Sequence, residues 1–358
     1  MPKDCTNHWG NLFEQASVKD NRPIIKALET NWDFLKPIEY PEIKKALRRM
    51  GNSAPGPDGV TPKALGLRNA QSLRALLNMM LVLEATPDHL AMARVVLIPK
   101  CDNPMLPSEY RPISISPVIV RCLNGILAER WSNSLLGLNS QMAFLKRDGC
   151  FDANVILDTT LKQAQRDCQN MAICSVDIAK AFDSISHDTI KRVASMYGAP
   201  DPLVISLSAP NVKLMIGNGS ISSIAYADDL IILASSNIGL QHKLNTLSKN
   251  LEKCGLKINT DKSFSIRRTK LGKEGKSCIT NSTFTVDGTK IRPLNNTDTF
   301  KYLGIPYGVG GVKYLNMNLE TIKMMTELDE APISITQKLE ILQSYAIPKL
   351  HYKLQLGM

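Results

Sequence analysis

The stretch Ile221-Ser-Ser-Ile-Ala-Tyr-Ala-Asp-Asp-Leu-Ile-Ile-Leu-Ala234 places two adjacent aspartates between two short apolar runs. Runs of this kind, separated only by a tight turn, predict a β-hairpin. Asp228 and Asp229 would then sit at its tip, where their carboxylates repel each other and resist desolvation. A divalent cation relieves such repulsion, and oxygen ligands suit Mg²⁺ or Mn²⁺. The alternative is an ordinary polar turn, because Asp is common in turns.

A third carboxylate strengthens the metal-site interpretation. The upstream run Ala-Ile-Cys-Ser-Val-Asp, residues 172–177, reads as a short apolar strand that ends in Asp177. Strands far apart in a sequence can be neighbours in one sheet, which would bring Asp177 to the two turn aspartates. Three carboxylates can hold two divalent ions about 4 Å apart and stabilise the attacking and leaving oxygens of a phosphoryl transfer. The combination predicts a polymerase.

The composition agrees with a polyanionic partner. The chain has 358 residues, is 44% hydrophobic and carries a formal charge of +10, with a pI near 9.1. This length suffices for two or three subdomains, and a basic balance fits RNA or DNA. The densest basic stretch reads either as a solvated loop or as a nucleic-acid contact and consists of Lys257, Lys262, Arg267, Arg268, Lys270, Lys273 and Lys276.

The eight cysteines do not follow a metal-binding pattern. No two have Cys-x-x-Cys spacing, which argues against a zinc knuckle. No signal peptide or long apolar run is recognisable, so we expect an intracellular chain with reduced thiols and no membrane association. A nuclear location and a cytoplasmic ribonucleoprotein remain equally open.

The predicted elements suggest a fold for the region around the aspartates. We expect a strand at 172–177, a helix at 186–197, the hairpin, a helix from about 237 to 254 and a strand at 256–259. This order resembles a split βαβ sheet with its helices on one face. Further along, the sequence predicts a strand at 300–305 and a helix at 334–346 that Pro348 would stop.

Nine segments together resemble one family, the reverse transcriptase core of non-LTR retrotransposons, and most of all its site-specific members with a restriction-like endonuclease. They are Ala54–Gly59, Ile98–Lys100, Tyr110–Ser114, Gln141–Phe144 with Gly149 and Cys150, Val176–Asp183, Tyr226–Asp229, Gly255–Asn259 with Lys262, Tyr302–Gly304 and Gln337–His351. The resemblance implies an α+β fold, the polymerase right hand. It implies fingers at 41–150, a ferredoxin-like palm at 151–310 and the start of a thumb at 311–358, after a poorly defined segment at 1–40.

The resemblance also implies roles for individual residues. Asp177, Asp228 and Asp229 would be catalytic and, with the backbone carbonyl of Ile178, would bind two Mg²⁺ ions, for which Mn²⁺ could substitute. Lys262 would donate a proton to the leaving pyrophosphate. The incoming deoxynucleoside triphosphate would be held by Lys100 and Arg111, with Phe182 as a steric gate against the ribose 2′-hydroxyl. Ordinary surface cations and a core phenylalanine are the alternatives for these last residues.

The implied function is RNA-directed DNA synthesis from a DNA primer on an RNA template. The first alternative is a catalytically inactive retroelement relic that at most binds RNA. An RNA-dependent RNA polymerase is disfavoured by Phe182 and by Ala227, which stands where glycine would be expected. Protein partners cannot be inferred.

One family block is missing. The signature Gln-Gly-Asp-Pro-Leu-Ser-Pro and the long helix that it opens do not occur, and only residues 199–220 separate the predicted helix from the hairpin. We therefore expect an internal deletion near 199–221 and an incomplete palm. The sheet would lose a packing partner, at about 1.5–3 kcal/mol for each deeply buried side chain uncovered. Weak or absent activity would follow.

Overall fold

The computed structural model describes residues 20, 22, 28–66, 70–134, 141–144, 147–200, 223–272, 276–281, 283–313 and 317–354. The chain divides into two units. Unit 1 comprises Met1–Gly137, Lys180–Leu214 and Lys253–Leu256. Unit 2 comprises Leu138–Ala179, Met215–Glu252 and Lys257–Met358.

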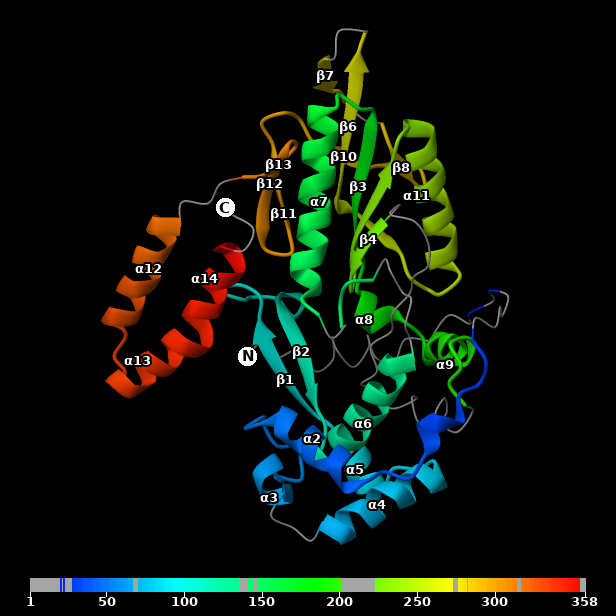
Figure 1. Cartoon of the computed structure of the whole chain (residues 1–358), viewed down its shortest axis with the longest axis vertical. Helices are drawn as coiled ribbons and strands as arrows, with labels where there is room; N and C mark the ends of the chain where they lie inside the picture. Colours follow the sequence, from blue (N-terminus) through cyan, green and yellow to red (C-terminus); the bar gives the residue numbers. More distant parts are fainter. Residues whose placement is uncertain are drawn as a thin grey trace. The chain divides into compact units, whose positions relative to one another are not determined.

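Unit 1 is mainly helical (Figure 1). Its elements are α2 (Tyr40–Met50), α3 (Pro62–Gly66), α4 (Ala70–Leu83), α5 (Asp88–Ala91), β1 (Arg94–Pro99), β2 (Tyr110–Ile115), α6 (Val118–Ser134), α8 (Ala181–Ser184) and α9 (His187–Met196). Helix α2 begins at a capping box formed by Glu39 and Glu42 and ends at Gly51, whose φ is +51°. Its buried Ile43 joins Leu77 of α4 and Ile126 of α6 in one core.

The Ala54–Gly59 loop is fastened to its surroundings in unit 1. The Arg121 guanidinium donates hydrogen bonds to the Ser53 hydroxyl at 3.1 Å and to the Ala54 carbonyl at 2.6 Å. Gly56 lies so close to Pro117 that a Cβ there would be 2.6 Å from the Pro117 nitrogen. This loop is therefore ordered by contacts that exclude a side chain at Gly56.

Unit 2 contains the sheet that carries the three aspartates. Its first elements are α7 (Gly149–Arg166), β3 (Met171–Ile178), β4 (Ser223–Tyr226), β5 (Asp229–Ala234), α11 (Asn237–Glu252), β6 (Ile258–Leu271) and β7 (Lys276–Ile279). They are followed by β8 (Thr285–Val286), β9 (Thr289–Lys290), β10 (Arg292–Pro293), β11 (Thr299–Tyr302), β12 (Ile305–Gly308), β13 (Gly311–Val312), α12 (Met317–Glu330), α13 (Ile335–Ile341) and α14 (Ile347–Leu354).

The strand order of the main sheet is β10-β6-β3-β5-β4, with β7 paired to β6. Strands β6, β3, β5 and β4 pair antiparallel throughout. In chain order these four are the fourth, first, third and second, which is the split βαβ arrangement expected from the sequence. The predicted α+β fold class is therefore confirmed.

Of the two helices expected on one face of this sheet, at 186–197 and 237–254, only the second belongs to its unit, and α7, which was not predicted, covers the other face. Ile173 and Ile231 point to a cluster that includes Leu161 of α7, whereas Cys174 and Ile232 point to one that includes Leu244 of α11. Alternate residues of a strand face opposite sides, so α7 and α11 cover opposite faces (Figure 1). Helix α9, which we expected on the sheet, belongs to unit 1.

The sheet is covered despite the missing family block. Ile173, Ile224 and Ile231 are each at most 2% exposed on one face, and Cys174 is fully buried on the other. The expectation that these strands would lose their packing is therefore wrong for the described residues. The proposed deletion itself lies at 199–221, of which only Ala199 and Pro200 are described.

Two strand predictions need correction. Strand β6 runs to Leu271, far beyond the predicted end at Asn259, because it pairs with β3 and β7 along its length. Much of the basic stretch at 257–276 is therefore strand and not loop. The strand predicted at 300–305 is correct for residues 300–302, which lie in β11, and for Ile305, which begins β12, but a hairpin turn interrupts it, with φ of +47° at Leu303 and +83° at Gly304.

Pro348 does not stop the C-terminal helix. A π-helical turn at Leu342–Ala346 joins α13 to α14, and the Ile347 N–H bonds to the Leu342 carbonyl. Proline clashes with a regular helix because its ring meets the carbonyl four residues earlier. The wider turn just before Pro348 gives room for the ring, so the helical course continues.

Among the described residues, no helix is long and apolar enough to cross a membrane.

Candidate active site

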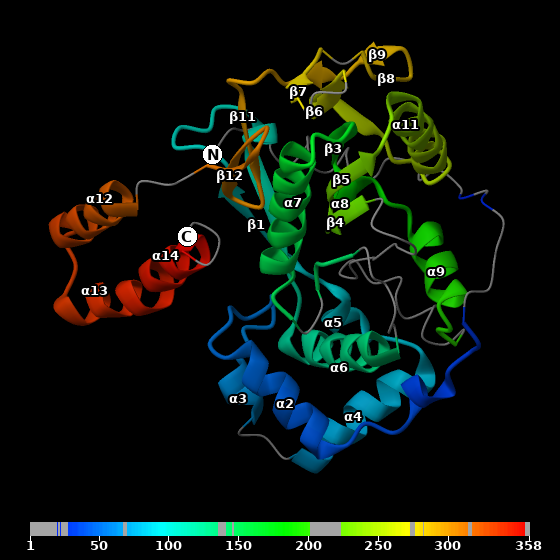
Figure 2. The same cartoon turned by 45° about the horizontal axis from the view of Figure 1, so that its top comes forward.

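The three aspartates lie at one end of adjacent strands in unit 2. The ladder between β3 and β5 ends at the pair Val176 and Leu230, so Asp177 and Asp229 are the next residues on neighbouring strands. Strands β4 and β5 are joined by a two-residue turn of Ala227 and Asp228, closed by the pair Tyr226 and Asp229. Figure 2 shows β3, β4 and β5 side by side. The hairpin expected from the sequence is therefore present.

Burial and the two neighbouring carboxylates act on Asp229. Desolvation, and then the negative charges of Asp228 and Asp177, raise the pKa of Asp229 above its ordinary value. Asp229 is exposed as a residue, so desolvation is limited and the two like charges are the informative cause. A site that disfavours its own ionised form suits a cation.

The arrangement is not a ready-made metal site. Within the described residues, no group of three or more His, Cys, Asp or Glu side chains is placed to hold a metal ion. The chemistry of the donors nevertheless fits Mg²⁺ or Mn²⁺, which prefer carboxylate and carbonyl oxygens. Asp177, Asp228 and Asp229 supply three carboxylates, and Ile178, the last residue of β3, could add a carbonyl.

A buried serine holds the strand end at Asp177, and sequence reasoning did not identify it. The pairing of β3 with β6 shifts register between Ser175 and Asp177, leaving several residues of β6 bulged. The Ser263 hydroxyl accepts a hydrogen bond from the Asp177 N–H at 3.1 Å and donates one to the Asn259 carbonyl at 2.6 Å. Ser263 is 1% exposed. The Ser263 hydroxyl therefore replaces the backbone hydrogen bonds that the bulge removes between β3 and β6.

Aromatic hydroxyls lie near the hairpin. A hydrogen bond with Cys150 and partial burial raise the pKa of Tyr226 to about 12. Tyr302 is 3% exposed, and its hydroxyl has no hydrogen-bond partner among the described residues. Burial, followed by the negative charge of Asp229, raises the pKa of Tyr302. Both phenols therefore stay protonated at neutral pH.

The predicted cations are exposed. Lys262, on β6 in unit 2, has no partner for its ammonium group among the described residues. In unit 1, the Lys100 ammonium donates to the Ser108 carbonyl at 2.7 Å, and Arg111 on β2 is opposite Ile98. Lys100 directly follows β1 and Arg111 lies near the start of β2, so both are at the same end of this strand pair. The backbone of Phe182 lies in α8, and its side chain is outside the described residues.

The reverse transcriptase (RNA-dependent DNA polymerase) family model matches this chain over residues 98–221 and 209–307, more than half of its length. The chain belongs to the reverse transcriptase family. The resemblance first drawn from short motifs is thereby confirmed, and the second matched segment contains the Asp228 hairpin of this reverse transcriptase domain.

Curated relatives are Pol polyproteins of R2 retrotransposable elements. The chain is 30% identical to that of element R2DM from Drosophila melanogaster, over 98% of this chain and 38% of the relative. It is 27% identical to that of an R2 element from Bradysia coprophila, over 96% of this chain and 45% of the relative. A Nasonia vitripennis R2 polyprotein is 28% identical over 90% of this chain and 36% of its own length.

This reverse transcriptase chain therefore spans less than half the length of these relatives. The Drosophila melanogaster comparison extends over 402 aligned positions, although this chain has 358 residues. The relative consequently has at least 44 positions (402 minus 358) with no counterpart here. A total of this size is in keeping with the block missing from the sequence.

Replacing Asp229 with asparagine is expected to stabilise the protein in the absence of divalent ions. The change removes like-charge repulsion, but the side chain is exposed and screened, so the free energy of unfolding should rise by less than about 1 kcal/mol. The gain should be present at neutral pH and vanish as the pH falls through the raised pKa of Asp229, because the wild-type group is then protonated. Thermal unfolding across pH measures it.

Two comparisons control this prediction. Asp261→Asn removes an exposed carboxylate from β6 in the same unit and should change stability by no more than about 0.5 kcal/mol. Added Mg²⁺ should stabilise the wild type more than Asp229→Asn. An Asp229→Asn protein that is less stable than the wild type without metal would contradict the repulsion.

Replacing Ser263 with alanine is expected to destabilise the protein by about 1–3 kcal/mol, because the Asp177 N–H and the Asn259 carbonyl lose their partner. Denaturant unfolding measures the change. Ser175→Ala is the matched control, because its hydroxyl on β3 has no hydrogen-bond partner among the described residues. Equal effects of the two changes would argue against a special role for Ser263.

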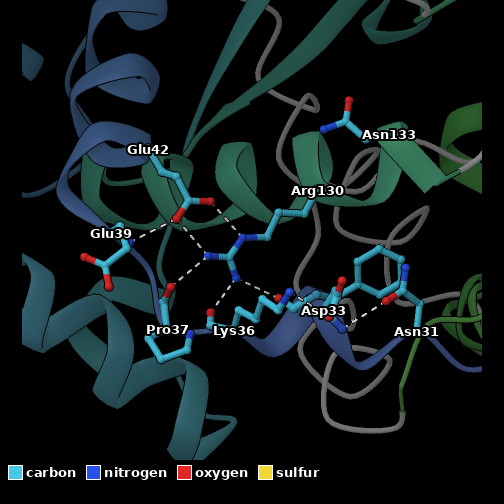
Figure 3. Close-up of a pocket in the computed structure, with 9 residues that line it drawn as sticks. Asn31, Asp33, Lys36, Pro37, Glu39, Glu42, Arg130 and Asn133 are labelled. Carbon is cyan, nitrogen blue, oxygen red and sulfur yellow. Dashed lines mark hydrogen bonds and ion pairs between the residues drawn. The ribbon is translucent and has the colours of Figure 1, made fainter.

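A hollow of about 450 Å³ in unit 1 is separate from the predicted site residues (Figure 3). Arg130 lies in it and donates to both carboxylate oxygens of Glu42 at 2.8 Å and to the carbonyls of Phe34, Lys36 and Pro37. The hydrogen bond from Arg130 holds the pKa of Glu42 below its ordinary value. All five guanidinium donors are used, so Arg130 joins α6 to the segment before α2.

Proposed function

We propose that this chain is the RNA-directed DNA polymerase core of a non-LTR retrotransposon. The observation that carries the proposal is the placement of Asp177, Asp228 and Asp229 at one end of neighbouring strands, in a chain of the reverse transcriptase family. Its relatives are named as Pol polyproteins of retrotransposable elements. The substrates would be deoxynucleoside triphosphates, with a DNA primer and an RNA template as nucleic-acid partners.

Asp177, Asp228 and Asp229, with the Ile178 carbonyl, would hold two Mg²⁺ ions, or Mn²⁺ in their place. When bound, the ions would activate the primer 3′-hydroxyl and neutralise charge on the triphosphate. The aspartates' own contribution is a fixed set of oxygens at the sheet end. The Ser263 hydroxyl supports these oxygens because it accepts a hydrogen bond from the Asp177 N–H. This bond keeps the end of β3 in one position.

The remaining residues act on the nucleotide. Lys262 has a free ammonium in the described part of unit 2 and would protonate the leaving pyrophosphate. Lys100 and Arg111 would bind the triphosphate through charge-assisted hydrogen bonds. Phe182 would exclude the 2′-hydroxyl of a ribonucleotide. We assign the fingers to residues 41–150, the palm to 151–310 and the start of the thumb to 311–358.

A catalytically inactive relic that binds RNA is the second candidate. It is favoured by the total of at least 44 aligned positions that the Drosophila melanogaster relative has and this chain lacks. Both candidates use the same basic chain, with its charge of +10, to hold RNA. They differ only in whether a primer is extended.

Primer extension on an RNA template, with binding of the same duplex measured in parallel, tests the proposal. The polymerase is supported if purified protein extends the primer with deoxynucleotides in Mg²⁺ or Mn²⁺ and stops when chelator is added. Binding without extension in either ion supports the relic. Neither binding nor extension would contradict both candidates.

A further inference from the structure

The side chain of Gln141 is buried beside the turn that carries Asp228. Gln141 is 3% exposed, although it lies outside any regular strand and makes an isolated parallel bridge with Ala225 of β4. The next residue, Met142, donates its N–H to the Ala225 carbonyl at 2.7 Å. Glutamine is rarely buried without specific partners, so its position calls for an explanation from its hydrogen bonds.

The Gln141 amide oxygen accepts two hydrogen bonds. One comes from the Ala143 N–H at 2.9 Å and fixes the local bend of the segment. The other comes from the Ala227 N–H at 3.0 Å, 86 residues further along the chain. An amide oxygen has two acceptor positions, and both are used here to tie one backbone segment to another.

The residue that Gln141 holds has an unfavourable backbone conformation. Ala227 has a φ of +55°, in the left-handed region where a Cβ is disfavoured. Such a conformation persists only where the surroundings impose it. Ala227 is the first residue of the two-residue turn and Asp228 is the second. The hydrogen bond at the Ala227 N–H therefore acts one peptide away from the Asp228 carboxylate.

The Gln141 segment is in turn pressed against the start of α7. A Cβ on Gly149 would lie 1.7 Å from the Met142 carbonyl oxygen, so no side chain fits there. Helix α7 is anchored in the core through the fully buried Leu157 and Leu161. The oxygen that contacts the turn is thus backed by a packed helix.

We propose that Gln141 is the positioning residue of the Asp228 turn: its buried amide oxygen fixes the backbone at Ala227 and so sets where the Asp228 carboxylate lies. The proposal rests on the proposed function for its catalytic consequence, but the hydrogen bond can be tested without it. Gln141 does not contact substrate in this role and acts through the turn alone.

Hydrogen exchange tests the positioning. In the wild type, the Ala227 amide should exchange at least about tenfold more slowly than the Asp228 amide, because only the first is held by Gln141. Gln141→Met has similar length and no acceptor, and should remove most of this difference. Gln141→Glu keeps an acceptor oxygen and should restore it. Gln163→Met, on the exposed side of α7, is the matched control and should leave exchange unchanged.

Mn²⁺ affinity, followed by electron paramagnetic resonance, tests the consequence for the carboxylates. Gln141→Met should weaken Mn²⁺ binding by about 10–100-fold, as loss of an outer hydrogen bond does in metal sites, and Gln163→Met should not. In primer extension, kcat should fall while KM for the deoxynucleotide stays within about twofold, because Gln141 is placed to affect Asp228 and not nucleotide contacts.

The outcomes are distinguishable. Equal exchange at Ala227 and Asp228 in the wild type would overturn the positioning role, even if Gln141→Met does not fold. A slow Ala227 amide, with exchange accelerated in Gln141→Met and unchanged Mn²⁺ affinity, would overturn the link to Asp228. A wild type with the expected exchange pattern but no Mn²⁺ binding would contradict the proposed function and leave the Gln141 hydrogen bond supported.

Discussion

Changing Asp228 to asparagine is expected to lower the rate of RNA-templated primer extension at least about a thousandfold. The amide has the size of the carboxylate and can occupy the same turn between β4 and β5. It lacks the negative charge that holds a divalent ion. Metal ions supply several kcal/mol of charge stabilisation in phosphoryl transfer, and about 4 kcal/mol corresponds to a thousandfold in rate. Single-turnover extension in Mg²⁺ measures the change.

Affinity for the RNA–DNA duplex serves as the internal control. Phosphate contacts come from Lys and Arg and depend on salt, so Asp228→Asn should bind the duplex as tightly as the wild type at one fixed salt concentration. Asp261→Asn, an exposed carboxylate on β6, should retain both extension and binding. Equal extension by Asp228→Asn and the wild type would remove Asp228 from the proposed reaction.

The sheet and its hairpin could be predicted because their signals are local. Apolar runs on both sides of Asp228 and Asp229 mark two strands, and the tight turn between them fixes their pairing. The apolar positions Leu240, Leu244, Leu247, Leu251 and Cys254 likewise predict the helix α11, and all are buried except Leu247, which is partly buried. Local periodicity was sufficient for these elements, and the order of strands then followed from their sequence order.

Other features depend on partners far away in the chain. Residues Thr260 to Lys262 look like a polar loop, but β6 continues past them because β3 pairs on both sides of the bulge. Gln141 and Ser263 were not identified as supports for the aspartates, since no spacing rule connects Gln141 to Ala227 or Ser263 to Asp177. For Gln141, the sequence offered one signal of a structural role: a short apolar segment follows it, and Gly149 comes shortly after.

The two covered faces of the sheet lead to the largest expected effects on stability. Leu161 of α7 and Leu244 of α11 are both fully buried, each in a different cluster. Leu161→Ala and Leu244→Ala should each lower the free energy of unfolding by about 2–5 kcal/mol, through lost burial and the cavity left behind. Denaturant unfolding measures both. Ile238 of α11 is 85% exposed, so Ile238→Ala should change the free energy of unfolding by no more than about 0.5 kcal/mol.

The double variant decides whether the two faces are independent. The leucines lie on opposite sides of the sheet and belong to different clusters, so their effects should add within about 0.5 kcal/mol if the protein remains folded enough to measure. If Leu161→Ala costs no more than Ile238→Ala, the α7 face of the sheet is not packed in solution. The uncovered sheet expected from the missing family block would then describe the protein better than the covered one, and weak polymerase activity would follow from a palm that is loose beneath its aspartates.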